Sequence, residues 1–350
     1  MNMKVGIIGC GGIAGMHAES YLHFPEEATL TACCDIDAAK AESFAKRFGI
    51  PHWYASCEEM LANEALDACD VCTWNSAHAP CTIAALNAGC HTICEKPMAM
   101  NAQEAQAMID AANKAGKLLM IGFIRRHGDD ARTAKSLIEN GELGQVYYVK
   151  AQYLRRCGFP GGWFGDKSRS GGGPLIDIGV HVIDLARYVM GGPKPVSVYG
   201  VTNDLMGSRW GLRLSAWESE TVVDQPIFDV ENLALAMIKF ENGATLQVEA
   251  SFNLNIKNDV GCVELYGDKA GLELDKFELH TIINGRNADV KLINAGSFEF
   301  GRDMDREVHN FIRAAQGLEA CIAPAEDGLE IMKILDAVYL SAKTGEVVKL

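Results

Sequence analysis

The chain has 350 residues, 48% of them hydrophobic, and a formal net charge of −14 at pH 7. This length exceeds one ordinary hydrophobic core, so we expect two domains. The negative charge, without any cluster of lysines and arginines, argues against nucleic acid and anionic membrane surfaces as partners, and no apolar stretch reaches the roughly 20 residues that span a bilayer.

The N-terminal segment KVGIIGCGGIAGMHAESYL predicts a strand rich in β-branched residues that is followed directly by a helix. Gly9, Gly11 and Ala14 fit GxGxx(G/A), in which the glycines let the backbone approach a pyrophosphate at the helix N-terminus. Taken alone, the glycines fit a plain glycine-rich turn about as well, but the strand and helix around them favour a nucleotide site.

The second strand, LTACCDID, ends at Asp35, about 20 residues beyond the glycines. An acidic side chain there accepts hydrogen bonds from the adenosine ribose and repels a 2′-phosphate, so we expect NAD rather than NADP as cofactor. Asp37 is explained by N-capping of the helix that follows.

Strands and helices continue to alternate as far as KLLMIGF, which predicts an α/β Rossmann domain over residues 1–123 with a doubly wound parallel sheet. Ligands of such sheets bind at the carboxyl ends of the strands. The candidate cofactor-binding residues are therefore Gly9, Gly11, Gly12, Ile13, Asp35, Thr73, Asn75, His78, Glu95, Lys96 and Arg125.

The twelve cysteines are spread over apolar segments, which is typical of reduced cysteines and indicates a cytoplasmic protein. Cys69 and Cys72 form a CxxC spacing, but they fall in a predicted strand and no second Cys/His pair lies nearby. We therefore expect no metal site.

Residues 124–350 show a different rhythm, with several strands, little helix between them and two closing helices. Predicted strands are VSVYGVT, LALAMIKF, ATLQVEASF, CVELYG and LELDKFELHTI, with an Asn-Gly hairpin turn in FENGATL. The pattern predicts a substrate-binding and oligomerisation α+β domain on a large, mostly antiparallel sheet. A sheet face without helices is the expected interface of a homodimer or homotetramer.

Asp177, His181 and Asp184 interrupt the otherwise apolar run PLIDIGVHVIDLARYV at spacings that place them on one helical stripe. Burying such groups is costly without partners or a ligand, so the stripe indicates a site. The glycines at 171–173 are expected to let the backbone pass close to a bound group.

These motifs, taken in order, resemble the glucose-fructose oxidoreductase / inositol dehydrogenase / MocA family of sugar and polyol dehydrogenases over essentially the full length. They are GIIGCGGIA, CDID, CTWNSAHAPCTIAALNAGCHTICEKP, GFIRRHGDDARTAKSLIENGELG, SGGGPLIDIGVHVIDL and EDGLEIMKILDAVYLSA. The segment YLRRCGFPGGWFGDKSRSGGG is similar to the branch that acts on glucosides or anhydrosugars, sometimes at ring carbon C3.

The resemblance implies that the family's EKP motif stands at Glu95, Lys96 and Pro97, and that its DxGxHxxD helix includes Asp177 and His181. In such enzymes the lysine and the histidine meet at the nicotinamide. The chain departs from the family in having a tryptophan at position 74, where proline is usual.

Hydride transfer from a secondary alcohol to NAD requires removal of the hydroxyl proton, which suits a base with a pKa near the operating pH. An ordinary histidine titrates near about 6.5 and a lysine near about 10.4. We therefore assign His181 as general base, Asp177 as its partner and Lys96 as the cation that holds the hydroxyl; the reverse assignment of Lys96 and His181 remains open. Asp184 fits either a structural or an orienting role.

Four further side chains are candidates for sugar binding: Arg155, Arg156, Trp163 and Lys167. The cations are placed to hydrogen-bond sugar hydroxyls, and the indole to stack on a sugar face. Solvated charges and a core tryptophan explain the same residues structurally.

Two other functions use the same residues. In an NAD-dependent glycoside hydrolase, transient oxidation permits elimination of a leaving group and ends without net redox change. A non-catalytic NAD-responsive regulator would keep the fold alone, and the joint presence of Lys96, Asp177 and His181 disfavours it.

Overall fold

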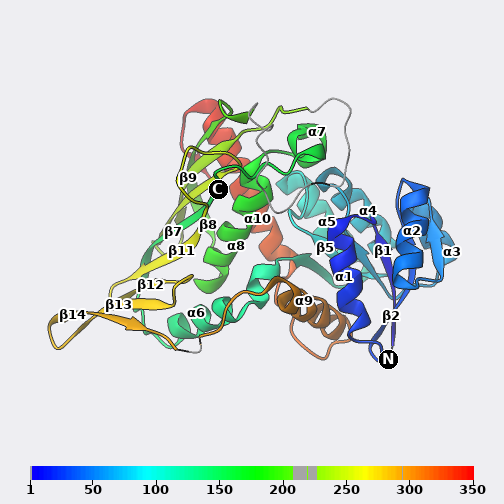
Figure 1. Cartoon of the computed structure of the whole chain (residues 1–350), viewed down its shortest axis with the longest axis horizontal. Coiled ribbons are helices and arrows are strands. Elements are labelled where there is room, and N and C mark those ends of the chain that lie inside the picture. Colours follow the sequence, from blue (N-terminus) through cyan, green and yellow to red (C-terminus); the bar gives the residue numbers. More distant parts are fainter. Residues whose placement is uncertain (1, 208–218, 220–226, 294) are drawn as a thin grey trace. The chain divides into compact units, whose positions relative to one another are not determined.

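The computed structural model describes residues 2–207, 219, 227–293 and 295–350 (Figure 1). The chain forms two compact units, one of Met1–His127 with Glu299–Leu329, the other of Gly128–Phe298 with Glu330–Leu350. The segment 299–329 therefore packs with the N-terminal unit, although its sequence follows the strand-rich part of the chain.

The N-terminal unit contains a six-stranded parallel sheet in the order β3-β2-β1-β4-β5-β6. Its strands are β1 (Met3–Ile8), β2 (Ala28–Cys34), β3 (His52–Tyr54), β4 (Ala68–Val71), β5 (His91–Glu95) and β6 (Leu119–Gly122). The strand order reverses between β1 and β4, which is where such sheets bind ligands. The predicted Rossmann sheet is confirmed.

The helices of this unit begin at side-chain caps where the sequence supplies them. The Asp37 carboxylate accepts hydrogen bonds from the backbone N–H groups of residues 39 and 40, as predicted. Ser56 caps the helix that begins at Cys57, and Asn101 caps the helix that begins at Ala102. The helices are α1 (Gly12–Leu22), α2 (Ala38–Phe48), α3 (Cys57–Asn63), α4 (Asn75–Asn87), α5 (Ala102–Ala115) and α9 (Phe300–Ala315). Helix α9 packs against α1.

The C-terminal unit is built on a nine-stranded sheet in the order β14-β13-β12-β11-β7-β10-β9-β8-β15. Its strands are β7 (Val146–Leu154), β8 (Pro195–Asn203), β9 (Leu233–Phe240), β10 (Thr245–Ser251), β11 (Val260–Gly267), β12 (Ala270–Glu273), β13 (Glu278–Ile283), β14 (Arg286–Lys291) and β15 (Val348–Lys349). Neighbouring strands are antiparallel except β7 and β10. The mostly antiparallel sheet is thus confirmed.

Two local predictions in this sheet have different outcomes. The Asn-Gly turn joins β9 to β10, with Gly243 at a φ of +88°, as predicted. The prediction of one strand through LELDKFELHTI is wrong, because the chain turns at residues 274–277 and forms β12 and β13 instead. The turn ends at Phe277, which has a φ of +52°. It contains no glycine or proline, the residues that indicate a turn in a sequence.

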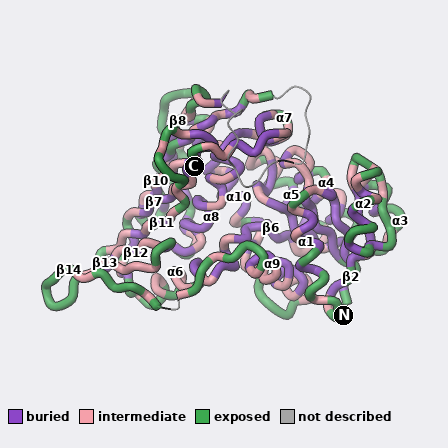
Figure 2. The backbone as a smooth tube through the Cα atoms, in the orientation of Figure 1, coloured by how far each residue is buried: buried purple, intermediate pink, exposed green. Residues whose placement is uncertain are grey.

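Helix α8 (Val180–Val189) packs on β7, β10 and β11 and on α6 (Asp129–Glu139). The unit also contains η2 (Gly162–Gly165), α7 (Lys167–Ser170) and η3 (Leu175–Gly179), and α10 spans Ala325–Thr344. Figure 2 shows buried backbone along the central strands and exposed backbone at β14. Among the described residues, no helix has both the length and the apolar character that crossing a membrane requires.

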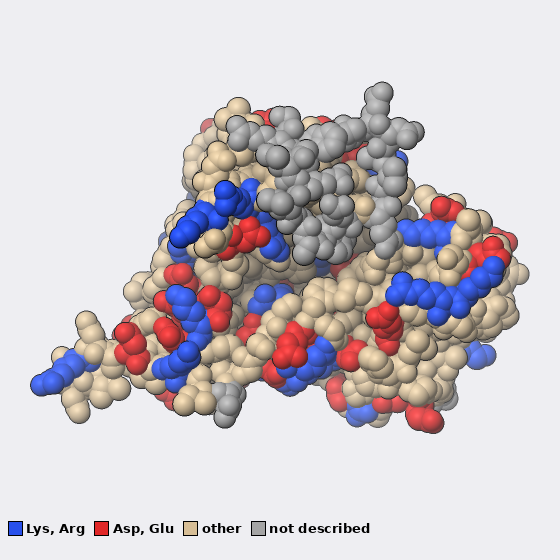
Figure 3. All heavy atoms as spheres, viewed as in Figure 1, with Lys and Arg blue, Asp and Glu red and all other residues tan. Residues whose placement is uncertain are grey.

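Charged side chains of both signs are interspersed on the face drawn in Figure 3. This mixed pattern agrees with the sequence, which has 46 acidic and 32 basic residues without long runs of either. On the described part of this face, the surface offers no single large cationic field of the kind that binds polyanions.

Candidate active site

The turn between β1 and α1 has the geometry of a phosphate-binding glycine turn. Gly9 has a φ of +90°, and a Cβ atom there would lie 2.7 Å from the Cys72 carbonyl oxygen, so the backbone needs glycine. Gly11 precedes α1 as its N-cap, and Gly12 and Ile13 form its first turn. The N-terminus of α1 thus carries backbone N–H groups beside the turn, a cradle that suits a pyrophosphate.

Asp35 follows β2 at the same edge of the sheet. Its Oδ2 accepts a hydrogen bond from the Cys10 backbone N–H at 2.9 Å, and its Oδ1 accepts one from the Asp37 N–H at 2.9 Å. The carboxylate therefore fixes the backbone of the glycine turn at the edge of the sheet where the parallel strands end. A carboxylate has further acceptor sites, so these two bonds leave capacity for ribose hydroxyls.

The other predicted cofactor residues follow the carboxyl ends of their strands. Thr73 and Asn75 come after β4, Glu95 ends β5, and Arg125 lies in η1 (Ile124–His127) after β6. Since β1, β4, β5 and β6 are parallel neighbours, the topology brings these positions to one edge. The sequence-predicted cofactor residues of this unit thus form one row along the sheet.

His78 is buried inside this row. Its Nδ1 lies 2.6 Å from the Pro97 carbonyl oxygen and its Nε2 lies 3.1 Å from the Thr73 carbonyl oxygen. Burial lowers the pKa of His78, which favours the neutral ring, and the ring nitrogen that carries the proton donates to its carbonyl partner. In the structure this ring links two loops of the edge through their backbones.

Lys96 follows β5 directly, and the Lys96–Pro97 peptide bond is cis. The Glu95 carboxylate fixes the backbone at Lys96, because its Oε2 accepts a hydrogen bond from the Lys96 backbone N–H at 3.0 Å. The predicted cation Lys96 therefore stands on a backbone anchored at the ligand-binding edge.

In the C-terminal unit, Asp177 and His181 lie on one continuous helical segment. Asp177 belongs to η3, a π-helical turn, and His181 to α8, which continues from it. Asp177 and Asp184 are buried, whereas His181 is partly exposed. A π-turn inside a helix often marks a functional site, because it widens the backbone locally.

The glycines before this helix pack against protein groups. A methyl group at Gly172 would overlap the Tyr339 hydroxyl, and one at Gly173 would overlap the Glu231 carbonyl oxygen. The Glu231 carboxylate also accepts hydrogen bonds from the Gly173 N–H at 2.9 Å, the Leu175 N–H at 3.2 Å and the Tyr339 hydroxyl at 3.0 Å. Burial raises the pKa of Glu231. In the structure, Gly172 and Gly173 lie against Tyr339 and Glu231, which fix the start of the helix, and the approach to a bound group stays a prediction.

Arg155 and Arg156 are held by one aspartate. The Arg155 guanidinium lies 3.0 Å from Asp259 Oδ2 and 3.0 Å from the Tyr153 hydroxyl. The Arg156 backbone N–H donates to Asp259 Oδ1 at 2.8 Å, and its guanidinium donates to the Lys257 carbonyl oxygen at 3.1 Å. Both side chains thus have structural partners at the end of β7.

Trp163 packs into an aromatic cluster, with its ring stacked on Phe164 at a centroid distance of 4.0 Å. Lys167 begins α7 and, with Thr202, Tyr339 and Lys343, lines a shallow hollow of the C-terminal unit. The structural explanation of Trp163 therefore has direct support, while Lys167 adjoins the tyrosine that braces the glycine segment.

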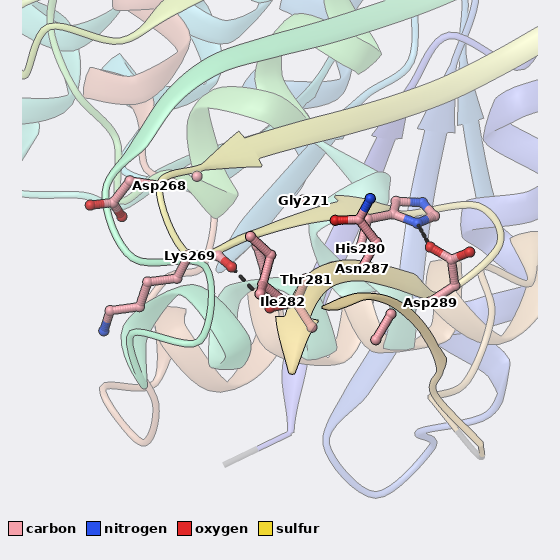
Figure 4. Close-up of a pocket in the computed structure, with 11 residues that line it drawn as sticks. Asp268, Lys269, Gly271, His280, Thr281, Ile282, Asn287 and Asp289 are labelled. Carbon is pink, nitrogen blue, oxygen red and sulfur yellow. Dashed lines mark hydrogen bonds and ion pairs between the residues drawn. The ribbon is translucent and has the colours of Figure 1, made fainter. Parts of the chain in front are cut away.

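A second hollow lies on the β12 to β14 strands and contains none of the predicted site residues (Figure 4). His280 lies there with Nδ1 2.7 Å from Asp289 and Nε2 3.1 Å from Glu273. These carboxylates raise the pKa of this half-exposed histidine. The arrangement is a surface ion-pair group across three neighbouring antiparallel strands, β12, β13 and β14.

The sequence interpretation missed one buried polar cluster in the N-terminal unit. His17 on α1 contacts Asp70 of β4 and Glu95 of β5, and Glu307 of α9 lies beside them. Asp70 could have indicated this cluster from the sequence, because a carboxylate in a fully buried strand needs a polar partner.

Comparisons with known proteins follow the same division. The chain matches the "Oxidoreductase family, NAD-binding Rossmann fold" over residues 3–123 and the "GFO/IDH/MocA C-terminal domain" over residues 131–273. It is 36% identical to a D-glucoside 3-dehydrogenase of Escherichia coli over 99% of this chain and 97% of that protein. It is 28% identical to a levoglucosan dehydrogenase of Pseudarthrobacter phenanthrenivorans over 97% of this chain and 96% of that protein.

Among solved structures, a levoglucosan dehydrogenase in complex with NADH and levoglucosan is similar, with a TM-score of 0.86 and 26% identity. The match covers 100% of this chain and 99% of that one. Sequence and fold therefore point to the same group of proteins.

Proposed function

The chain belongs to the Gfo/Idh/MocA family of NAD(P)-dependent sugar and polyol oxidoreductases, and from this premise we propose that it oxidises a secondary ring hydroxyl of a glucoside or anhydrosugar with NAD. The observation that carries the proposal is the full-length similarity to a D-glucoside 3-dehydrogenase. That relative's name favours ring carbon C3 as the site of oxidation.

The proposed mechanism assigns one role to each side chain. His181 takes the hydroxyl proton, Asp177 orients and stabilises its imidazolium, and Lys96 stabilises the developing alkoxide. The chemistry that NAD would supply when bound beside these residues is acceptance of the hydride from the carbon. The anchored backbone at Lys96 and the braced helix that carries His181 support these roles, because proton transfer requires fixed groups. The opposite assignment, with Lys96 as base, uses the same residues.

Asp35 supports NAD over NADP. Its carboxylate accepts two backbone N–H groups beside the glycine turn, at the position where the adenosine ribose of a Rossmann cofactor lies. A 2′-phosphate there would meet this negative charge.

A substrate panel tests the proposal. NAD and NADP are supplied separately with glucosides, levoglucosan, inositols and aldoses, and nicotinamide reduction is followed by absorbance. We expect turnover with NAD on the glucosides or levoglucosan, and at least about tenfold lower kcat/KM with NADP. Release of aglycone without accumulation of NADH would favour the hydrolase instead, and tight NAD binding without any product would favour the regulator.

We also propose that the chain forms a homo-oligomer through one face of its C-terminal sheet. Tyr199 and Val201 of β8 pair with Met237 and Leu235 of β9, and all four side chains are exposed. The residues that alternate with them are buried, except Thr202, which is partly exposed. Such an apolar group on a sheet is typical of a subunit interface.

Light scattering after size-exclusion chromatography measures this assembly. The wild-type protein is expected as a dimer or tetramer, and Met237→Glu as a smaller species, because a charge would be buried at the contact. Leu22→Glu on α1, also exposed, is the control and should leave the mass unchanged. A monomeric wild type at micromolar concentration would refute the proposal.

The cytoplasm is the compartment that we propose. All twelve cysteines are free in the structure, and most are buried. A reducing compartment suits this many thiols. Secretion of the mature protein into an oxidising medium would contradict it.

A further inference from the structure

His17 has both ring nitrogens directed at carboxylates. Its Nδ1 lies 2.8 Å from Asp70 Oδ2 and its Nε2 lies 3.1 Å from Glu95 Oε1, and all three residues are buried. Carboxylate oxygens accept hydrogen bonds, so each nitrogen must donate, which requires the doubly protonated ring. Burial alone would lower the pKa of His17, but the charges and hydrogen bonds of Asp70 and Glu95 raise it well above its usual value.

The same arrangement argues against a metal ion, although the donor set resembles one. His17, Asp70 and Cys72 bring their donor atoms within 4.8 Å of one another, as do His17, Glu95 and Glu307. An imidazole binds a metal through a nitrogen lone pair, and both nitrogens here donate protons to carboxylates. The cluster is therefore a buried ion-pair network around one cation.

Glu95 transmits this contact to Lys96. One carboxylate oxygen faces His17, and the other accepts the Lys96 backbone N–H at 3.0 Å. Gly122 on the neighbouring strand β6 leaves room for it, since a Cβ atom there would lie 3.1 Å from Glu95 Oε1. With both oxygens engaged and a strand packed beside it, the Glu95 carboxylate has one orientation.

The network also reaches the glycine turn. His17 lies in α1 five residues after Gly12, where the helix begins beside the predicted pyrophosphate position. Asp70 lies in β4, the strand between β1 and β5. His17 therefore joins the helix that follows the cofactor turn to the two strands whose ends carry Cys72 and Lys96.

We propose that His17 is a positioning residue for Lys96. Its charged ring fixes the Glu95 carboxylate, and that carboxylate fixes the backbone of Lys96 at the ligand-binding edge. The inference rests on the proposed function, since it takes Lys96 as the residue that holds the substrate hydroxyl. Loss of the Glu95 contact misplaces Lys96 and lowers kcat, whereas loss of the Asp70 contact leaves the lysine in place.

Two substitutions separate these contacts. The amide nitrogen of His17→Gln takes the place of Nε2 and keeps a donor toward Glu95, while that of His17→Asn takes the place of Nδ1 and keeps one toward Asp70. We expect His17→Asn to lower kcat about tenfold and His17→Gln to retain kcat within about threefold. Dissociation constants for NADH, measured by fluorescence, should change alike in the two variants.

A merely structural role predicts a different result. Both variants lose the buried charge, so their melting temperatures fall together, and kcat would then fall equally in both. Equal kcat values for the two variants would overturn the inference. If neither variant folds, Glu95→Gln replaces them, because its amide accepts from His17 but turns an N–H group toward the Lys96 N–H; unchanged kcat in that variant would also overturn the inference.

A second measurement does not depend on turnover. Reductive ¹³C-methylation labels the lysine amines for NMR, and the Lys96 resonance is assigned by its absence in Lys96→Arg. We expect this resonance to shift in His17→Asn and to stay in place in His17→Gln. If the wild type oxidises no sugar but the resonance shifts in this way, the proposed function fails and the positioning role stands. If the wild type turns over and the resonance is the same in all three proteins, the positioning role fails.

Discussion

Replacing either Lys96 or His181 by alanine is expected to lower kcat about 10² to 10⁴-fold, the range that positioned proton-transfer groups contribute. Removing His181 leaves the hydroxyl proton without its acceptor, and removing Lys96 leaves the developing alkoxide without its cation. Steady-state kinetics on the substrate identified by the panel measures both effects. KM should change less than kcat, because these interactions strengthen in the transition state.

The pH dependence of the same variants decides which residue is the base. If His181 is the base, the acidic limb of the kcat/KM profile disappears in His181→Ala and persists in Lys96→Ala. The exposed residues Lys114 and His52 provide controls, and their alanine variants should match the wild type. Wild-type kcat in either Lys96→Ala or His181→Ala would refute the assigned role of that residue.

The second large effect is expected for stability. Gly173→Ala should destabilise the protein by about 2–3 kcal/mol, since the added methyl group would overlap the backbone carbonyl of Glu231, which cannot move like the end of a flexible side chain. The hydrogen bond from the Gly173 N–H to the Glu231 carboxylate would be strained at the same time. Urea unfolding followed by circular dichroism measures the change.

Gly261→Ala is the matched control for this prediction. Gly261 lies in strand β11, and a Cβ atom there meets nothing within 4 Å. That variant should stay within about 1 kcal/mol of the wild type, because alanine in an open strand position adds no overlap. Equal unfolding midpoints for the two variants would show that Gly173 is not held against Glu231.

Most of the fold could be predicted because its signals are local. The glycine turn after β1, the Asp37 cap and the Asn-Gly hairpin before β10 each lie within a few residues of the structure that they specify. The edge row from Gly9 to Arg125 follows from strand alternation alone, since parallel strands end at one edge.

The supporting contacts could not be predicted, because their partners lie far apart in sequence. His17 meets residues 53 and 78 positions away, and the Tyr339 hydroxyl donates to a carboxylate 108 positions away. Nothing in the local pattern pairs such groups. The π-turn at Asp177 was equally hidden, since the apolar spacing of a single π-turn resembles that of an α-helix.

The central claim is that this chain moves a hydride from a sugar carbon to NAD. A glucoside or levoglucosan deuterated at C3, incubated with the enzyme and NAD, tests it most directly by NMR of both products. The account predicts deuterium at nicotinamide C4 of NADH, in amounts equal to the ketosugar formed. Deuterium that remains in the sugar, with no NADH formed from a substrate that is nevertheless consumed, would contradict it.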